Sequence, residues 1–253
     1  MFTLAAMSQA WDLARAAARG AGIDLRPLTT VEDADRINDV IEATWGGQRM
    51  DREVVRALAE SGNVPWGGAD GDRLVGFVLG WAGVDAEGLH VHSHMLAAIP
   101  DRRHRGIGFA LKLAQRAQAL DQGVSVIRWT FDPLVARNAW LNVGKLGAVV
   151  DRFERDYYGA MADDLNAGER SDRFMVRWEL ERPPGPREVH GVATEIAIPR
   201  DLYELRERDP DRARRWRDEV ATAAEEAIER DEIGVAFEKD RATYLFVPRE
   251  ASA

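Results

Sequence analysis

The sequence predicts a mixed α/β (α+β) fold, in which short strands and amphipathic helices follow one another along the chain. Three observations lead to this prediction. Apolar and polar residues alternate in short runs, apolar residues recur every three or four positions in longer runs, and glycine or proline separates the two kinds of run. The resulting order is β-α-α-β-β-β-α-β-α-β-β, followed by a smaller βαββ segment.

The elements are justified in order along the chain. A strand over 23–28 precedes a helix over 29–45, for which Thr29 or Thr30 is the N-cap and acids occupy the first turn. A second helix is expected over 51–60, and the glycine pair at 67–68 and the turn at 69–73 mark two strands. The remaining elements are strands over 73–83, 89–99, 124–131, 148–159 and 172–180, and helices over 108–123 and 134–147.

Both ends of the chain lie outside this pattern. Residues 1–22 read as a short amphipathic helix, without the basic start and hydrophobic block of a signal peptide. "RPPGP" at 182–186 is typical of a linker. The tail of under 70 residues beyond it has few large apolar groups, so we expect it to dock on the main domain or on a partner subunit. The predicted parts are a helix at 1–22, a domain at 23–181 and a βαββ extension at 187–253, with strands over 188–198, 233–239 and 243–247 and a helix over about 211–230.

Composition limits the class of protein. The 253 residues suffice for one large domain or two small ones, and 45% hydrophobic content can fill a core. The absence of cysteine excludes a disulfide scaffold, a zinc–thiolate site and a thiol nucleophile. No apolar run approaches the roughly 18 to 20 residues of a membrane span, so a cytoplasmic protein with no membrane partner is expected. The net charge of -9 argues against a nucleic-acid partner.

A basic cluster stands out in this acidic chain, directly before the turn Gly106-Ile107-Gly108 that opens a helix. The cluster consists of Arg102, Arg103, His104 and Arg105. A dinucleotide fingerprint would need a third glycine where Leu111 stands, and the P-loop pattern is absent. Glycines let the backbone approach a ligand closely, and the start of a helix attracts anions. The cluster therefore indicates a site for a small anion, with an ordinary solvated loop as the alternative.

The spacing Arg103-x-x-Gly106-x-Gly108 resembles the R/Q-x-x-G-x-G/A motif of the Gcn5-related N-acetyltransferase (GNAT) superfamily, which binds the pyrophosphate of acyl-coenzyme A. The element order over 23–180 is also that of the superfamily's core. The segments "HSHMLAAIP", "WTFDP" and "RNAWLNVGKLGA" look like a poorly characterised branch with a similar tail. The resemblance implies a mostly antiparallel sheet flanked by helices and splayed between its fourth and fifth strands, with acetyl-CoA or another acyl-CoA as co-substrate. Separately, no acid near the histidines of the strand over 89–99 completes a ligand set, so no metal is expected.

The resemblance also implies where acyl-CoA binds. The pantetheine arm would insert between the strand ending at Ile99 and the strand ending at Phe131. Backbone groups would pair with the arm as if it were another strand, and the Ala98 N–H would face the thioester oxygen. Two alanines that simply finish a strand are the alternative. The residues expected to bind acyl-CoA are Leu96, Ala97, Ala98, Arg103, His104, Arg105, Gly106, Ile107, Gly108 and Asn138.

Three histidines, His90, His92 and His94, alternate along one strand and so project from one face. With neighbours about 6.6 Å apart, three cannot share one metal ion without a bulge. In the histone-acetylating branch of the superfamily a glutamate base lies six residues before the splay residue, and counting back from Ala98 reaches His92. An ordinary histidine pKa near 6.5 suits a base near neutrality. The resemblance thus implies His92 as general base and His94 as the second candidate, with polar residues satisfied within a sheet as the alternative.

The general acid departs from the family pattern. The superfamily often protonates the departing thiolate with a tyrosine on the last helix, where this chain has Val143. Tyr157 or Tyr158 is expected to substitute, or the thiolate leaves unassisted. Both tyrosines equally suit core positions with an exposed hydroxyl.

Candidates for the acceptor site come from three places. Trp45, followed by two glycines, suggests an aromatic lid or else a helix end with a buried tryptophan. Asp132 would bind the ammonium of an acceptor or cap the next helix. Arg173 would suit an acceptor carboxylate or a surface ion pair.

Together these features predict an acyl-CoA-dependent N-acyltransferase. It would move an acetyl or succinyl group to a primary amine of a small molecule, such as an amino acid, by direct attack in a ternary complex. The alternative is a non-catalytic acyl-CoA-binding or regulatory protein, which the missing helix tyrosine and the added tail favour. A protein-modifying acetyltransferase would need an open acceptor groove. A homodimer, which the tail could complete, stays open.

Overall fold

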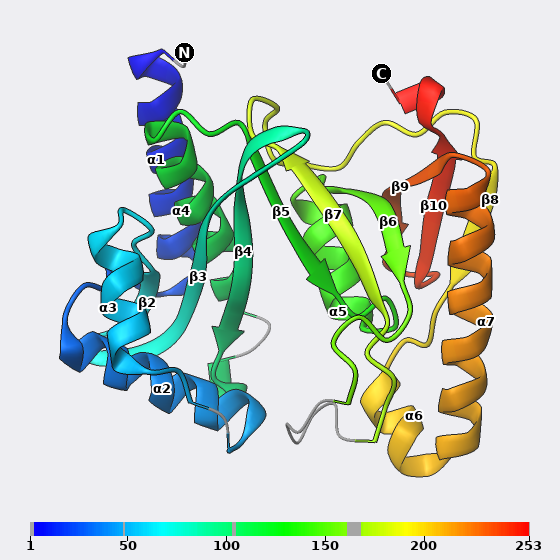
Figure 1. The fold of residues 1–253 in the computed structure, drawn as a ribbon, viewed down its shortest axis with the longest axis horizontal. Helices are drawn as coiled ribbons and strands as arrows, with labels where there is room; N and C mark the ends of the chain where they lie inside the picture. The colour runs from blue at the N-terminus through cyan, green and yellow to red at the C-terminus, as the bar shows by residue number, and fades with distance from the viewer. Residues whose placement is uncertain (1–2, 48, 103–104, 161–167, 253) are drawn as a thin grey trace. The chain divides into compact units, whose positions relative to one another are not determined.

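The structure is a computed structural model and describes residues 3–47, 49–102, 105–160 and 168–252. The chain divides into two compact units (Figure 1). The first unit runs to Arg128 and the second begins at Trp129, so the division falls within one strand. The domain boundaries expected from the sequence stay predictions.

The first unit holds a sheet with strand order β1-β2-β3-β4-β5. Neighbouring strands are antiparallel, except that β4 and β5 run parallel. A mostly antiparallel sheet flanked by helices confirms the predicted fold class. Its elements are α1 (Leu4–Ala21), β1 (Asp24–Pro27), α2 (Val31–Trp45), α3 (Arg52–Glu60), β2 (Trp66–Asp70), β3 (Arg73–Asp85), β4 (Gly88–Ala98), a 3₁₀ turn (Pro100–Arg102), α4 (Ile107–Asp121) and the start of β5 (Val126–Phe131).

Of the two threonines expected to cap α2, Thr30 is the N-cap. The Thr30 hydroxyl accepts the Asp33 N–H at 3.1 Å, and the Asp33 carboxylate accepts the N–H groups of Thr29 and Thr30 at 3.0 and 3.2 Å. This reciprocal capping box satisfies donors that the first turn of a helix leaves unpaired. Burial alone would raise the pKa of Asp33, but these hydrogen bonds and the charge of Arg26 lower it.

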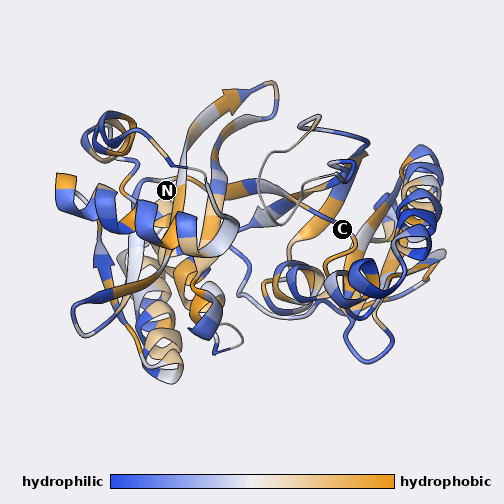
Figure 2. Ribbon diagram, turned by 90° about the horizontal axis from the view of Figure 1, so that it is seen from below, coloured by the Kyte–Doolittle hydropathy of each residue, from blue (hydrophilic) through white to orange (hydrophobic). Residues whose placement is uncertain are grey.

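Glycines in β3 let α4 approach one face of the first sheet. A Cβ at Gly76 would lie 2.9 Å from Ile107, and a Cβ at Gly80 would lie 2.9 Å from Gln115. α1 packs beside α4, whereas α2 packs against β3 and β4. Since side chains alternate along a strand, Trp81 points to the face opposite α4. In Figure 2 the helices are hydrophilic on their outward sides, and hydrophobic residues gather along the strands.

The second unit continues from β5 with strand order β5-β7-β6-β9-β10-β8. β9 pairs with β6 and with β10, and β10 pairs with β8, each antiparallel. The tail beyond the linker therefore docks on strands of the predicted main domain, which was one of the two arrangements expected. The elements are α5 (Ala136–Ala139), a π-helical turn (Trp140–Lys145), β6 (Val149–Glu154), β7 (Arg173–Glu179), β8 (Thr194–Ala197), α6 (Leu202–Arg208), α7 (Pro210–Glu229), β9 (Glu232–Glu238), β10 (Thr243–Pro248) and a 3₁₀ turn (Arg249–Ser252).

The tail supplies part of the core of the second unit. The buried Phe174 ring of β7 lies 5.2 Å from Tyr244 and 6.0 Å from Phe246, measured between centroids. It also lies 6.0 Å from Phe131 on β5. The Tyr244 hydroxyl donates to the Pro133 carbonyl at 2.8 Å, so even the polar end of this ring is satisfied inside the unit.

Several details differ from the sequence prediction. The strand expected over 148–159 ends at Glu154. The helix expected over 134–147 is α-helical only in its first turn and continues as a π-helical turn, where a Cβ at Gly144 would overlap the Trp140 ring. α6 was not predicted. The strand expected over 188–198 is confined to Thr194–Ala197.

Candidate functional site

The glycine turn opens α4 as expected. Gly106 is the N-cap with φ of 87°, a left-handed conformation that side chains strain to adopt. Its carbonyl accepts the Ala110 N–H at 3.0 Å, and Arg105 and Gly106 are exposed. Ile107 is buried, and its Cγ2 would lie 2.9 Å from a Cβ at Gly76. The turn is thus anchored on its inner side and open on its outer side, where the first helical turn presents N–H groups.

The basic cluster before this turn is partly described. Arg102 forms an ion pair with Asp70 at the end of β2. Arg105 is exposed. Arg103 and His104 lie outside the described residues, so their expected roles stay predictions.

Along one edge, the end of β4 is paired with β3. Ala98 pairs with Gly76, Ala97 with Phe77 and Leu96 with Val78, all on β3. On the other side, the described ladder between β4 and β5 holds only Val91 with Ile127 and His92 with Arg128. β4 then continues for six residues to Ala98.

A β-bulge falls at the histidines of β4. Leu79 pairs with Met95 and Gly80 with Ser93, so His94 is the extra residue on β4. At Gly80 a Cβ would overlap the His92 carbonyl and lie 2.9 Å from the Ser93 Cα. Glycine at position 80 therefore permits the close approach of the two strands at the bulge.

His92 and His94 gather over one ring. Their centroids lie 5.3 and 4.9 Å from the Trp81 ring and 6.0 Å from each other. Burial lowers the pKa of both imidazoles, and the charges of His94, His90 and Lys112 lower that of His92 further. Two of the three histidines expected on one face thus lie over the same ring, and both are neutral near pH 7.

His90 differs from the other two histidines. Its ring packs over Gly83, where a Cβ would lie 3.0 Å from Nε2. Its Nδ1 lies 3.3 Å from the Gly88 carbonyl and 3.9 Å from an Asp85 oxygen. His90 therefore belongs to the hairpin between β3 and β4.

The opposite face of the bulge carries a buried lysine that the sequence interpretation missed. The Lys112 ammonium nitrogen donates to the Ser93 hydroxyl at 2.7 Å and to Gln115 Oε1 at 3.3 Å. Lys112 is 1% exposed, and burial lowers the pKa of its amine well below the ordinary value. The available signal was a lysine amid the apolar positions of a helix that is buried along most of its length.

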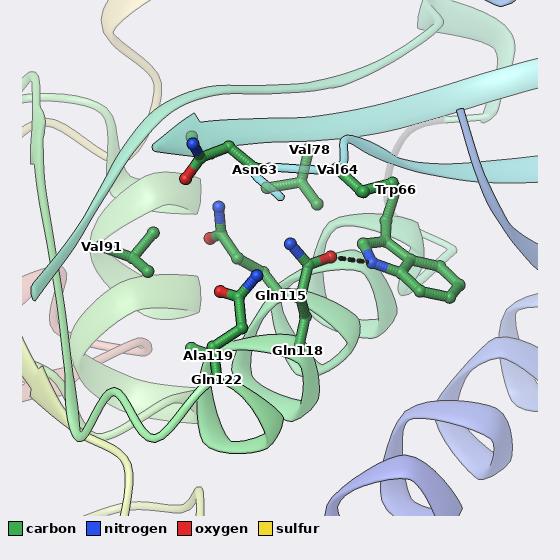
Figure 3. A pocket seen from close by; sticks show the side chains of 10 residues that line it. Asn63, Val64, Trp66, Val78, Val91, Gln115, Gln118, Ala119 and Gln122 are labelled. Atoms are coloured by element: carbon green, nitrogen blue, oxygen red, sulfur yellow. Dashed lines mark hydrogen bonds between the residues drawn. The ribbon is translucent and has the colours of Figure 1, made fainter. Parts of the chain in front are cut away.

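Gln115, which accepts a hydrogen bond from this lysine, also lines a small polar cavity (Figure 3). Its volume of about 10 Å³ is near the size of one water molecule. Figure 3 shows amides converging on the cavity from α4 and from the segment before β2, and the Trp66 indole donates to Gln118. The amide side chains lining it are Asn63, Gln115, Gln118 and Gln122.

Asp132, at the end of β5, is engaged within the second unit. Its carboxylate accepts two hydrogen bonds from Arg217 of α7, at 3.3 and 2.9 Å, and the Leu134 N–H at 2.9 Å. Arg217 is 4% exposed and also donates to Glu169 at 3.3 Å. The bond from Leu134 matches the capping alternative for Asp132. A tail residue 85 positions away, which no sequence pattern indicated, occupies the rest of the carboxylate.

Tyr158 and Tyr157 stand in different surroundings. The Tyr158 hydroxyl lies 3.1 Å from the Thr130 hydroxyl of β5, and the Arg173 guanidinium lies 5.3 Å from its ring centroid. Tyr157 packs edge-on to Tyr158 at 4.6 Å. Arg173 is buried and donates to the Asp172 carbonyl at 2.8 Å. Of the two tyrosines, Tyr158 has its hydroxyl beside β5.

The remaining candidates keep local roles. Trp45 ends α2, is half-buried against the core of the first unit and is followed by Gly46 and Gly47 with φ of 71° and 57°. Asn138 is half-buried, with its N–H donating to the Val135 carbonyl at 2.8 Å. Val143, at the family's tyrosine position, is fully buried.

The described residues offer neither a cluster of metal ligands nor a helix able to cross a membrane. No group of three or more histidine or acidic side chains is placed to hold a metal ion among them. In the same part of the chain, the helices are too short or too polar to cross a membrane.

Comparison with known proteins matches residues 34–140 to the family model described as "Acetyltransferase (GNAT) family". No curated protein matches the sequence. Solved structures do resemble it. The ribosomal-protein-S18-alanine N-acetyltransferase from Escherichia coli is 15% identical with a TM-score of 0.52, over 66% of this chain and 99% of that one.

Two further structures resemble the chain to the same degree. The Salmonella typhimurium protein yncA, solved with its cofactor acetyl-CoA, is 16% identical with a TM-score of 0.51, over 66% of this chain and 99% of its own. A chain of the NatC complex bound to Gag peptide and CoA is 18% identical with a TM-score of 0.51, over 62% of this chain and 98% of that one. At these identities the likeness shows the fold.

Proposed function

Since the chain belongs to the GNAT superfamily, we propose that it is an acyl-CoA-dependent N-acyltransferase that acts on a primary amine of a small molecule. The observation that carries the proposal is the bulge of β4, which holds two neutral imidazoles over Trp81 shortly before the strand end expected to bind the thioester. Acetyl is the expected acyl group, with succinyl as the alternative. An amino acid is the expected kind of acceptor.

The turn at Gly106 supports the cofactor assignment. An open turn with a left-handed glycine and a helix start behind it suits a pyrophosphate. Arg103 and Arg105 would add positive charge. The described ladder between β4 and β5 ends at His92, which supports insertion of the pantetheine arm along β4 beyond that residue, with the Ala98 N–H directed at the thioester oxygen.

The proposed chemistry is a single displacement. The amine nitrogen forms a bond to the thioester carbonyl carbon, and the C–S bond breaks as the tetrahedral intermediate collapses. His92, or else His94, takes a proton from the attacking nitrogen. The departing coenzyme A thiolate takes a proton from a tyrosine or from water. We place Tyr158 ahead of Tyr157 for this role, because Thr130 orients its hydroxyl.

The acceptor residues remain part of the proposal. We propose Trp45 as an aromatic lid and Arg173 as the partner of an acceptor carboxylate, whereas Asp132 would act on the acceptor only if Arg217 released it. We further propose that the protein is cytoplasmic. A homodimer, which the tail could complete, stays open.

A thiol-release screen tests the function. Purified protein would be incubated with acetyl-CoA or succinyl-CoA and a panel of amino acids and polyamines. Turnover is expected with at least one pair. Arg103→Glu should raise the KM for acyl-CoA, and His92→Ala should chiefly lower kcat. Coenzyme A binding without thiol release across the panel would instead support the acyl-CoA-binding regulator.

A further inference from the structure

The first unit has a groove that the proposed reaction does not use. Its volume is about 590 Å³, within the range of small-molecule sites. α1 forms one wall and β1 and β2 form the other. Because β3 separates β2 from β4, the groove begins about 10 Å across the sheet from the histidines. The lining residues are Trp11, Arg15, Ala18, Arg19, Ile23, Asp24, Leu25, Pro27 and Trp66.

Two tryptophans of the groove are fixed by their polar edges. The Trp11 indole N–H donates to Asp121 at 2.6 Å, and the Trp66 indole N–H donates to Gln118. Their ring centroids lie 4.7 Å apart with planes inclined at 52°. Because both indole N–H groups already donate hydrogen bonds within the protein, the two tryptophans offer only apolar ring surface to a ligand in the groove. Rings oriented before binding lose little conformational entropy when a flat ligand packs against them.

Two arginines supply positive charge beside these rings. The Arg15 guanidinium carbon lies 5.9 Å from the Trp11 ring centroid. Arg15 also forms an ion pair with Asp12, and both side chains of this pair are exposed. The Arg19 guanidinium has neither a hydrogen bond nor an ion pair within the described part of the chain. Asp24 is the acid of the lining, and two further carboxylates, Asp12 and Asp121, are engaged by Arg15 and by the Trp11 indole. The positive charge open to a ligand is that of Arg19, joined by Arg15 because an exposed ion pair such as Arg15–Asp12 is weak. An anion is the ligand that these two guanidinium groups would bind.

We propose that this groove is a second binding site, for a planar aromatic ring that carries a phosphate or a carboxylate. The ring packs on Trp11 and Trp66, and the anionic group binds Arg15 and Arg19. The site combines α1 with the first strands of the unit. The two ligand sources, a nucleotide and an aromatic acid, share this chemistry and are separated by the test.

The test is calorimetric titration with adenosine 5′-monophosphate, with indole-3-carboxylate and with uncharged adenosine, each with the protein saturated with coenzyme A. We expect at least one of the two anions to bind with a Kd below about 1 mM and adenosine to bind about tenfold more weakly than its phosphate. The preferred anion identifies the source. Absence of binding by both anions overturns the proposal, as does equal binding of adenosine and its phosphate.

Variants locate the binding. Arg15→Gln combined with Arg19→Gln should weaken the anion about tenfold or more. Arg56→Gln is the matched control, because Arg56 is a helix-surface arginine paired with Glu60 outside the groove. Unchanged affinity in the double variant, or an equal loss in the control, overturns the site. Because the titration needs no turnover, its result is independent of the proposed enzyme activity.

Discussion

The Lys112 amine donates a 2.7 Å hydrogen bond to the Ser93 hydroxyl, on the side of β4 opposite His92 and His94. Ser93 lies between the two histidines in sequence and pairs with Gly80 at the bulge. This hydrogen bond from α4 therefore fixes the position of Ser93, the residue between the two proposed bases.

Lys112→Met tests the protonation state of this buried amine. Burial lowers the pKa of folded Lys112, so between that pKa and the ordinary value near 10.5 the unfolded chain holds a proton that the folded chain lacks. In that window the wild type gains stability as pH rises. The methionine variant lacks this slope, so its free energy of unfolding relative to wild type should fall between pH 7 and pH 10. Urea unfolding at several pH values measures it, and a constant difference would contradict it.

The histidine pair should set the acid limb of the pH–rate profile. Burial and neighbouring charges lower the pKa of His92, and burial lowers that of His94, so the limb of kcat/KM should fall at a pH below 6.5. His92→Ala should reduce kcat by about 10²–10⁴-fold. His90→Ala is the matched control, because His90 packs over Gly83 in the hairpin. Equal losses in both variants would contradict the assignment.

Arg217→Ala should destabilise the second unit. It leaves the Asp132 carboxylate without its bidentate partner, and breaking a buried ion pair costs about 3–5 kcal/mol. Arg214→Ala, on the same helix, removes an exposed pair with Asp211 and should cost under about 1 kcal/mol. Urea unfolding compares the two. Similar losses would mean that the Asp132 pair contributes no more than a surface pair.

Gly80→Ala should disturb the bulge. Its Cβ would overlap the His92 carbonyl, and such overpacking typically costs about 1–3 kcal/mol. Gly20→Ala is the control, because a Cβ there meets nothing within 4 Å and alanine favours a helix by about 0.5–1 kcal/mol. The midpoint temperature of thermal unfolding should therefore fall in Gly80→Ala and rise in Gly20→Ala. A neutral Gly80→Ala would mean that the strands separate at no cost.

Local signals predicted much of the fold. The cap at Thr30, the alternation along β4 and the glycine at the start of α4 each act within a few residues, and each is found in the structure. The shared face of His92 and His94 followed from strand periodicity alone.

Long-range partners were beyond the sequence. The Arg217 bond to Asp132 joins positions far apart, and neither residue type in isolation predicts a buried pair. The π-helical turn after Ala139 depends on the packing of Trp140 against Gly144. The bulge at His94 arises from a register shift that strand periodicity does not reveal.

The pairing of β9 with β6 determines how the chain can be shortened. A version ending at the linker would lose the neighbour of β6 and two aromatic rings from around Phe174. It would then present bare main-chain donors and acceptors along one strand and an opened apolar interior, both of which favour intermolecular association. Residues 1–181 expressed alone should therefore collect in inclusion bodies.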